Sequence, residues 1–276
     1  MFLQTTTHKI DIDRVYKVIH YIYNTLVLKT NSSSNMSQIV CIEGNIGSGK
    51  STLLNVLRRN YDGQKHMNNI PKFVFVNEPL DIWNTIRDKA GLTALQHFYN
   101  DQEKYAFSFQ MMAYISRLSR LQEAIRNHPD AIIIVERSVF TDKHVFASML
   151  YRDGKMNEIE FQVYLKWFDH FIQELPPISL VYVHTDPDVC VNRVKKRNRK
   201  GEEGISLEYL TSCHTYHEKM IHEMHKNQVG VLTLDGNSNK GEQSEFGDLE
   251  YIHWIKDIRD FIYKNKKETI SLDQLP

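Results

Sequence analysis

A glycine-rich segment from Gly44 to Ser51 carries the residue types that bind phosphate. It reads GNIGSGKS and fits the pattern GxxxxGK[ST]. Glycines allow successive backbone N–H groups to surround a phosphate, and a following helix adds the positive end of its dipole. The pattern predicts a nucleoside triphosphate site in which Lys50 reaches the β- and γ-phosphates and Ser51 ligates Mg²⁺. The expected contacts are Gly44, Asn45, Ile46, Gly47, Ser48, Gly49, Lys50, Ser51 and Thr52.

Two glutamates follow apolar segments that are typical of β-strands. Glu78 comes after KFVFV and Glu136 after AIIIV, and Arg137 follows Glu136 directly. In an open parallel sheet, functional groups gather where the strands end, so both carboxylates should face the phosphate site. An acidic residue in this position of a phosphate-binding fold belongs to the Mg²⁺ site, either as a direct ligand or as a partner of the direct ligands. We therefore expect Glu136 to join Ser51 in holding the metal ion.

A cationic segment lies between residues 193 and 200, where six of eight side chains are Lys or Arg. The chain as a whole is neutral, with 34 Lys and Arg against 34 Asp and Glu. A dedicated nucleic-acid protein would carry a general basic excess, so no nucleic-acid partner is expected. The run is better explained as a lid that clamps phosphate through Arg193, Arg197 and Arg199.

Strands and helices must alternate along the chain to position these groups. Apolar, β-branched segments predict strands at residues 38–43, 72–76, 131–135, 180–184 and 229–234. Helical spacing predicts helices at residues 52–59, 103–127 and 158–174, after residue 188, and near 249–263. The alternation predicts an α/β fold with a five-stranded parallel sheet flanked by helices.

Residues 1–36 differ in composition from the remainder of the chain. They mix polar and aromatic residues and end in a polar stretch typical of a linker. We expect a partly helical or disordered extension before a domain spanning residues 37–276. Apolar runs too short to cross a bilayer predict no membrane partner. The three cysteines form no paired pattern, which favours a reducing compartment, the cytoplasm, with a mitochondrial location left open.

Five motifs in order resemble the deoxyribonucleoside kinases of the deoxycytidine and deoxyguanosine kinase type. They are EGNIGSGKST, NEPLDIW, FSFQ followed by ISR, ERSVFTDKHVFASMLY and RVKKRNRKGEEGISLEYL, and they span most of residues 38–235. The resemblance implies a P-loop kinase fold with an arginine-rich lid. It implies transfer of the γ-phosphate of ATP, with Mg²⁺, to the 5′-hydroxyl of a deoxynucleoside. It also implies a homodimer.

The resemblance assigns roles to individual residues. Glu78 matches the general base that takes the proton from the 5′-hydroxyl, and Arg137 matches the arginine that orients it. Lys50 and the lid arginines Arg193, Arg197 and Arg199 would neutralise the phosphoryl oxygens. The residues that match the acceptor pocket are Glu78, Trp83, Phe98, Tyr99, Phe109, Gln110, Ala113, Arg117, Arg137, Asp142, Phe146 and Glu202.

Substrate choice follows from part of this pocket. Gln110 matches the amide that bonds the base edge. Arg117 and Asp142 match the Arg and Asp of enzymes that act on deoxycytidine and purine deoxynucleosides, so thymidine should be disfavoured. Tyr99 and Glu202 match the pair that holds the 3′-hydroxyl, with Glu203 as the alternative to Glu202.

Other functions remain open at this point. A thymidylate-kinase-like enzyme shares the phosphate loop and lid, but it needs a further arginine where this chain has Asn77, and Glu78 would repel a monophosphate. A non-catalytic subunit with a phosphate loop is disfavoured by the candidate base and lid arginines. The histidines of one helix, His214, His217, His222 and His225, do not share a helix face, so no metal site is expected there.

Overall fold

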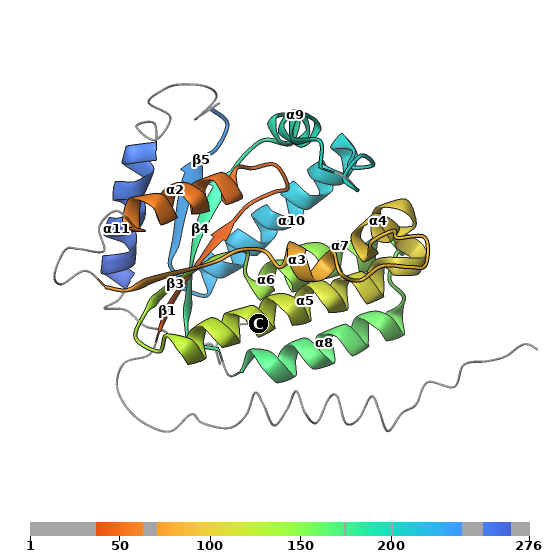
Figure 1. Ribbon diagram of the computed structural model, residues 1–276, viewed down its shortest axis with the longest axis horizontal. Coiled ribbons are helices and arrows are strands. Elements are labelled where there is room, and N and C mark those ends of the chain that lie inside the picture. The colour runs from red at the N-terminus through yellow and green to blue at the C-terminus, as the bar shows by residue number, and fades with distance from the viewer. Residues whose placement is uncertain (1–36, 63–70, 174, 200, 239–250, 266–276) are drawn as a thin grey trace, which may run out of the picture. The chain divides into compact units, whose positions relative to one another are not determined.

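The computed structural model describes residues 37–62, 71–173, 175–199, 201–238 and 251–265. The strands are β1 (Gln38–Glu43), β2 (Phe73–Val76), β3 (Ile132–Glu136), β4 (Ile178–His184) and β5 (Val231–Asp235). Every pairing is parallel, and the strand order is β2-β3-β1-β4-β5 (Figure 1). The predicted five-stranded parallel sheet is confirmed. β1 lies at its centre, so the segment after β1 is flanked by the ends of β3 and β4.

Helices cover both faces of this sheet. The helices of the described residues are α2 (Lys50–Asp62), α3 (Leu80–Trp83), α4 (Ala94–Asn100), α5 (Gln102–Asn127), α6 (Val139–Thr141), α7 (Ser148–Arg152), α8 (Glu158–Ile172), α9 (Pro187–Arg197), α10 (Leu207–Lys226) and α11 (Ile252–Asn265), with a π-helical turn, η1 (Asp142–Ala147), between α6 and α7. Side chains set several helix starts, as where Asn157 and Glu160 form a capping box at α8.

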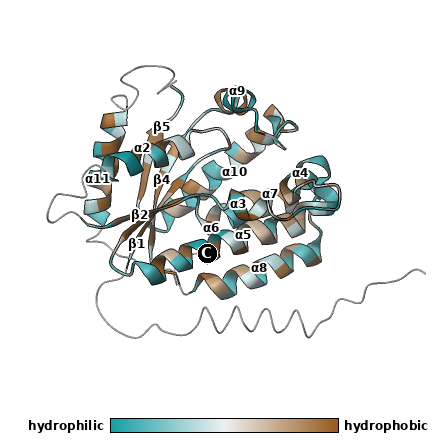
Figure 2. Ribbon diagram, in the orientation of Figure 1, coloured by the Kyte–Doolittle hydropathy of each residue, from teal (hydrophilic) through white to brown (hydrophobic). Residues whose placement is uncertain are grey.

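Alternate residues of the strands are buried on opposite faces of the sheet. Ile39 and Cys41 of β1 join a core that includes residues of α5, α8 and α10. Val40 and Ile42 join a second core with residues of α2 and α11. Because both faces are covered, the strands are hydrophobic along almost their whole length, whereas the helices show mixed stripes (Figure 2).

The strand limits differ by one or two residues from those expected, for local reasons. β4 begins at Ile178, directly after Pro177, which has no N–H to give to a neighbouring strand. β5 begins at Val231 because the N–H of Val229 donates to the carbonyl of Met224 at the end of α10. Among the described residues no helix is both long and apolar enough to cross a bilayer. The expected extension, residues 1–36, lies outside the described residues.

Candidate active site

A pocket of about 470 Å³ opens where the strands end. Residues 46–51 of the glycine loop, which spans residues 44–51, form one part of its wall, and α3, α4, α5, η1, α9 and the segment after α9 contribute other parts. The expected site residues that line it are Ile46, Gly47, Ser48, Gly49, Lys50, Ser51, Thr52, Glu78, Trp83, Phe98, Tyr99, Phe109, Gln110, Ala113, Arg117, Glu136, Arg137, Asp142, Phe146, Arg193, Arg197, Arg199 and Glu202. Two expected residues, Gly44 and Asn45, do not line it.

The glycine loop is held in a backbone shape that only glycine tolerates. Gly47 has φ of 82°, and a Cβ there would lie 2.6 Å from the carbonyl oxygen of Cys190. Asn45 is buried behind the loop, where its Nδ2 donates to the carbonyl of Leu210 at 2.8 Å. Asn45 therefore anchors the loop to α10 instead of facing the pocket.

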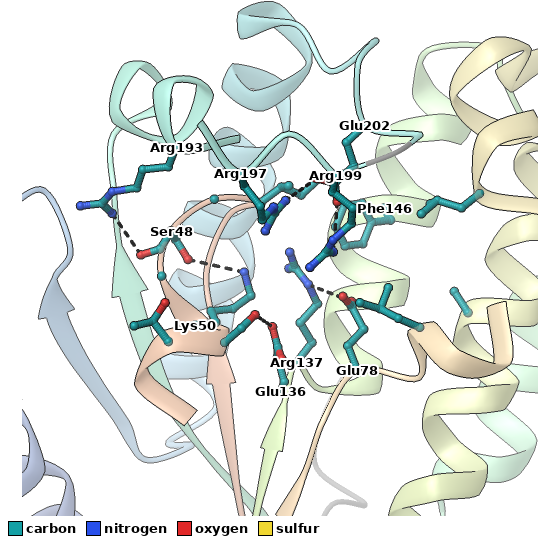
Figure 3. A pocket seen from close by; sticks show the side chains of 18 of the residues that line it. Ser48, Lys50, Glu78, Glu136, Arg137, Phe146, Arg193, Arg197, Arg199 and Glu202 are labelled. Atoms are coloured by element: carbon teal, nitrogen blue, oxygen red, sulfur yellow. Dashed lines mark hydrogen bonds and ion pairs between the residues drawn. The ribbon is translucent and has the colours of Figure 1, made fainter. Parts of the chain in front are cut away.

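Lys50 is buried at the start of α2. Its Nζ donates to the carbonyl oxygen of Asn45 at 2.6 Å. It also lies 3.5 Å from Oγ of Ser48 in the glycine loop (Figure 3). Burial, followed by the nearby Arg137, lowers the pKa of Lys50 to about 7, against the opposing effect of Glu136 and Glu78. This lysine lies in a position where an anionic ligand would strongly favour its charged form.

Ser51 and Glu136 meet at the same edge of the sheet. The hydroxyl of Ser51 donates to Oε1 of Glu136 at 2.5 Å. β3 ends at Glu136 and pairs directly with β1, which leads into the loop that carries Ser51. The two side chains together offer the oxygen donors that Mg²⁺ prefers.

Glu78 follows β2 and lies between two arginines. Its Oε1 is 3.3 Å from Nη2 of Arg117 and 3.5 Å from Nε of Arg137. Burial acts to raise the pKa of Glu78, but Arg117, Arg137 and Lys50 together lower it below its ordinary value. The carboxylate is therefore ionised and held in a fixed orientation.

Arg117 of α5 is buried in a network with Asp142 of η1. Its Nε donates to Oδ2 of Asp142 at 2.9 Å, and its Nη1 donates to the backbone carbonyl of Glu136 at 3.3 Å. Burial raises the pKa of Asp142, while Arg117 opposes that effect. η1 also carries Phe146 into the pocket wall. A π-helical turn of this kind leaves no sequence signal, and such turns are frequent at functional sites.

Aromatic rings of α3, α4 and α5 form another part of the pocket wall. Phe98 stacks on Phe109 with ring centroids 4.6 Å apart, and Trp83 meets Phe109 edge-on at 5.5 Å. Gln110 lies next to these rings and is almost fully buried. Its Oε1 has no hydrogen-bond partner among the described residues. A buried amide oxygen without a partner is costly, so it is suited to a polar ligand edge.

Two arginines of the lid segment line the pocket and form ion pairs with Glu202. Oε2 of Glu202 accepts from Nη2 of Arg197 at 2.5 Å, and its Oε1 accepts from Nη1 of Arg199 at 3.2 Å. Burial and the nearby Glu202 raise the pKa of Tyr99. Glu203 is exposed and accepts from the N–H of Gly201, so Glu202 is the carboxylate that faces the pocket. Arg193 donates to the carbonyl of Ser48 at 3.4 Å.

His217 of α10 contacts the pocket from behind and was not expected there. Its Nδ1 is 2.7 Å from the carbonyl oxygen of Cys213, so Nδ1 must carry the proton. Its Nε2 then accepts from Nη1 of Arg137 at 3.4 Å. Burial and Arg137 lower the pKa of His217 well below its ordinary value, which keeps it neutral. Its ring also meets Phe146 edge-on.

Sequence reasoning also missed several residues that line the pocket. Tyr209 of α10 meets Tyr99 edge-on, with ring centroids 6.2 Å apart. Tyr251 and Trp254 line the pocket from the region of α11. In the sequence, an aromatic residue on an amphipathic helix has the spacing of a hydrophobic-core residue. The pattern therefore does not distinguish these pocket residues from residues that only pack in the core.

A parallel sheet with a glycine loop, paired carboxylates and a cationic lid is the architecture of α/β phosphotransferases. The family model described as deoxynucleoside kinase matches residues 40–249. Mouse deoxycytidine kinase is 33% identical over 243 residues, covering 78% of this chain and 90% of the relative. Mitochondrial deoxyguanosine kinase of Xenopus laevis is 31% identical over 215 residues, covering 70% and 78%. A probable deoxycytidine kinase of fowlpox virus is 32% identical over 221 residues, covering 78% and 86%.

The chain therefore belongs to the deoxynucleoside kinase family. It is an enzyme, a nucleoside kinase that uses a nucleotide as phosphate donor. The resemblance seen in the five motifs is confirmed, and the thymidylate-kinase-like alternative is not supported.

Proposed function

We propose that this enzyme transfers the γ-phosphate of ATP to the 5′-hydroxyl of deoxycytidine or a purine deoxynucleoside, in nucleotide salvage. The observation that carries the proposal is the position of Glu78. Its carboxylate contacts Arg137, which donates to Gly44 of the glycine loop that suits a triphosphate. The same carboxylate contacts Arg117, which lies against Trp83 of the aromatic wall that suits a nucleoside. The 5′-hydroxyl of a nucleoside bound against that wall would lie next to both the general base Glu78 and the phosphate donor.

In the proposed mechanism the residues position the reactants and supply charge. Glu78 takes the proton of the 5′-hydroxyl while the oxygen of that hydroxyl attacks the γ-phosphorus. The bond between the γ-phosphorus and the oxygen that bridges it to the β-phosphate breaks. Arg137 and Arg117 hold the carboxylate in orientation. Lys50 and the lid arginines Arg197 and Arg199 face the phosphoryl oxygens, where they stabilise developing charge. Preorganised charges of this kind require little rearrangement during the reaction.

Ser51 and Glu136 would hold Mg²⁺ beside the glycine loop. Their hydroxyl and carboxylate oxygens fit the hard-oxygen preference of that ion, and both lie next to Lys50 in the pocket wall. Bound Mg²⁺ would neutralise charge on the phosphate oxygens.

A panel of four deoxynucleosides at fixed ATP and Mg²⁺ tests the proposed function. We expect kcat/KM for deoxycytidine or a purine deoxynucleoside to exceed that for thymidine, because the buried pair of Arg117 and Asp142 can bond amino groups and ring nitrogens of a base. Thymidine as the best substrate would contradict the proposed preference. Phosphorylation of thymidine monophosphate in place of all four nucleosides would contradict the function itself.

His217 should act as a positioning residue for Arg137. Replacing His217 with leucine removes the acceptor of the Arg137 hydrogen bond, so we expect kcat to fall about 10-fold or more with a smaller change in KM. His217→Gln keeps an acceptor and should recover part of the loss. His222 is exposed on the same helix, so His222→Leu is the matched control. Equal kcat in His217→Leu and His222→Leu would show that the contact plays no part in catalysis.

We also infer a homodimer formed through α5 and α8. These helices lie side by side and leave Ile115, Ile159 and Val163 exposed, an apolar surface suited to a second copy (Figure 1). The mass of the assembly in solution decides between monomer and dimer.

We further infer a kinase domain spanning residues 37–276, which the family match from residue 40 supports. All three cysteines are buried and unpaired, which supports a reducing compartment, and we infer the cytoplasm.

A further inference from the structure

A second group of ligand side chains lies where β4 ends against α10. His184 is the last residue of β4, and His214 and Glu218 lie four residues apart on α10. One ligand atom from each lies within 4.8 Å of the other two. Nε2 of His184 is 3.7 Å from Oε1 of Glu218, and the two imidazole centroids are 5.2 Å apart. None of the three residues lines the pocket described above.

We propose that His184, His214 and Glu218 form a binding site for a divalent transition metal ion of the Zn²⁺ type. Two imidazole nitrogens and one carboxylate are a donor set that suits Zn²⁺ and disfavours Mg²⁺ and Ca²⁺, which take oxygen ligands. Zn²⁺ binds such donors at about 2.0–2.2 Å, so ligand atoms this close need only small side-chain rotations to converge. Two of the ligands share a helix face because of their spacing.

Two further features of the group favour an ion. Nδ1 of His214 is buried and has no hydrogen-bond partner among the described residues, so a ligand would relieve an unsatisfied polar atom. The hydroxyl of Tyr182 donates at 2.6 Å to Oε1 of Glu218, the oxygen that lies 3.7 Å from Nε2 of His184, and a carboxylate oxygen can accept this bond and still bind an ion. Outer hydrogen bonds of this kind orient a ligating carboxylate. The side chains of His184 and Glu218 are 33% and 47% exposed, which provides a path of entry.

An ion at this position would tie the end of β4 to α10. The carbonyl of His184 accepts from the N–H of Gly236, which lines the active-site pocket, at 2.7 Å. The next residue, Thr185, donates to the carbonyl of Ser48 in the glycine loop. α10 also carries His217, the partner of Arg137. A bound ion should therefore stabilise the folded enzyme at the back of its active site.

Calorimetric titration of Zn²⁺ into the full chain tests the proposal. The protein is prepared without a histidine tag, stripped with chelator and held in excess Mg²⁺ with no nucleotide, so the result does not depend on the proposed substrates. We expect one Zn²⁺ per chain, with a Kd of roughly micromolar or tighter, and a Tm higher by several degrees when Zn²⁺ is present. The three buried cysteines offer no competing surface thiol. Absence of binding and of any Tm shift would overturn the proposal.

Variants locate the ion. His184→Gln and Glu218→Gln should each weaken Zn²⁺ binding by at least about tenfold. Tyr182→Phe removes only the hydrogen bond to Glu218, so it should weaken Zn²⁺ binding no more than the loss of a ligand does. His222→Gln, on an exposed histidine of the same helix, should bind as the wild type does. Circular dichroism establishes that each variant is folded. Wild-type affinity in His184→Gln, or an equal loss in His222→Gln, would place the ion elsewhere and overturn the assignment.

Discussion

Replacing Glu78 with glutamine should lower kcat by about 10²–10⁴-fold while ATP binding persists. The amide has the size of the carboxylate and can still meet Arg117 and Arg137, but it cannot take the proton of a hydroxyl. The substitution leaves unchanged the glycine loop and Lys50, which would hold the triphosphate. Steady-state rates and the Tm shift produced by ATP measure the two effects separately.

Glu103→Gln is the matched control for this substitution. Glu103 lies exposed at the start of α5, where it pairs with Lys155 at 2.7 Å, so its loss should leave kcat unchanged. Turnover of Glu78→Gln within a few-fold of wild type would refute the assigned base. Loss of ATP binding together with turnover would instead point to damage to the pocket as a whole.

The surroundings of Glu78 also set a pH dependence. Its neighbouring cations lower its pKa below the ordinary 4.5, although burial opposes them. A carboxylate with a depressed pKa stays ionised, and keeps the stability of its ion pairs, until the pH falls through the folded value. The base should therefore remain active at every pH above its ordinary pKa. A fall of kcat/KM toward acid that begins above pH 4.5 and disappears in Glu78→Gln would contradict the lowered pKa of Glu78.

The sequence is most informative where chain order determines position. Glu78 and Glu136 could be predicted because each follows an apolar strand, and the ends of parallel strands meet at one edge. The glycine loop could be predicted because its pattern has one dominant structural use. The aromatic wall and Gln110 came from the family resemblance, since helical spacing alone is equally consistent with a hydrophobic core.

Contacts that join distant segments could not be predicted in the same way. Arg137 and His217 are separated by 80 positions, and only the packing of α10 against the sheet brings them together. His184 meets His214 and Glu218 for the same reason, although the helix alone places just two of these ligands on one face. Asn45 fits the phosphate-loop pattern, yet its buried side chain anchors the loop to Leu210 because α10 passes behind it.

Replacing Arg117 and Asp142 together with Met and Ala should raise the ratio of kcat/KM for thymidine over deoxycytidine by about 10–10²-fold. In the proposed acceptor site the wild-type pair would place charge beside the nucleobase and leave poor surroundings for a 5-methyl group. The double change is required because Arg117→Met alone leaves the buried carboxylate of Asp142 without its ion-pair partner, at a cost of about 3–5 kcal/mol. Asp142→Ala alone leaves the buried Arg117 paired with Glu78 and still beside the nucleobase site. Arg117 also contacts Glu78, so the absolute kcat should fall for both substrates. The ratio isolates specificity from that loss.

Arg120 and Asp81 provide the matched control for this double change. They form an ion pair one turn further along α5, more exposed than the pair of Arg117 and Asp142. Replacing Arg120 with Met and Asp81 with Ala removes the same chemical groups from a solvated site, where ion pairs contribute little to stability. The substrate ratio should then stay at its wild-type value. If the control moves the ratio as far as the buried pair does, base choice is set elsewhere. If neither change moves the ratio, we expect the nucleobase to be selected by Gln110, whose Oε1 has no hydrogen-bond partner within the described part of the chain.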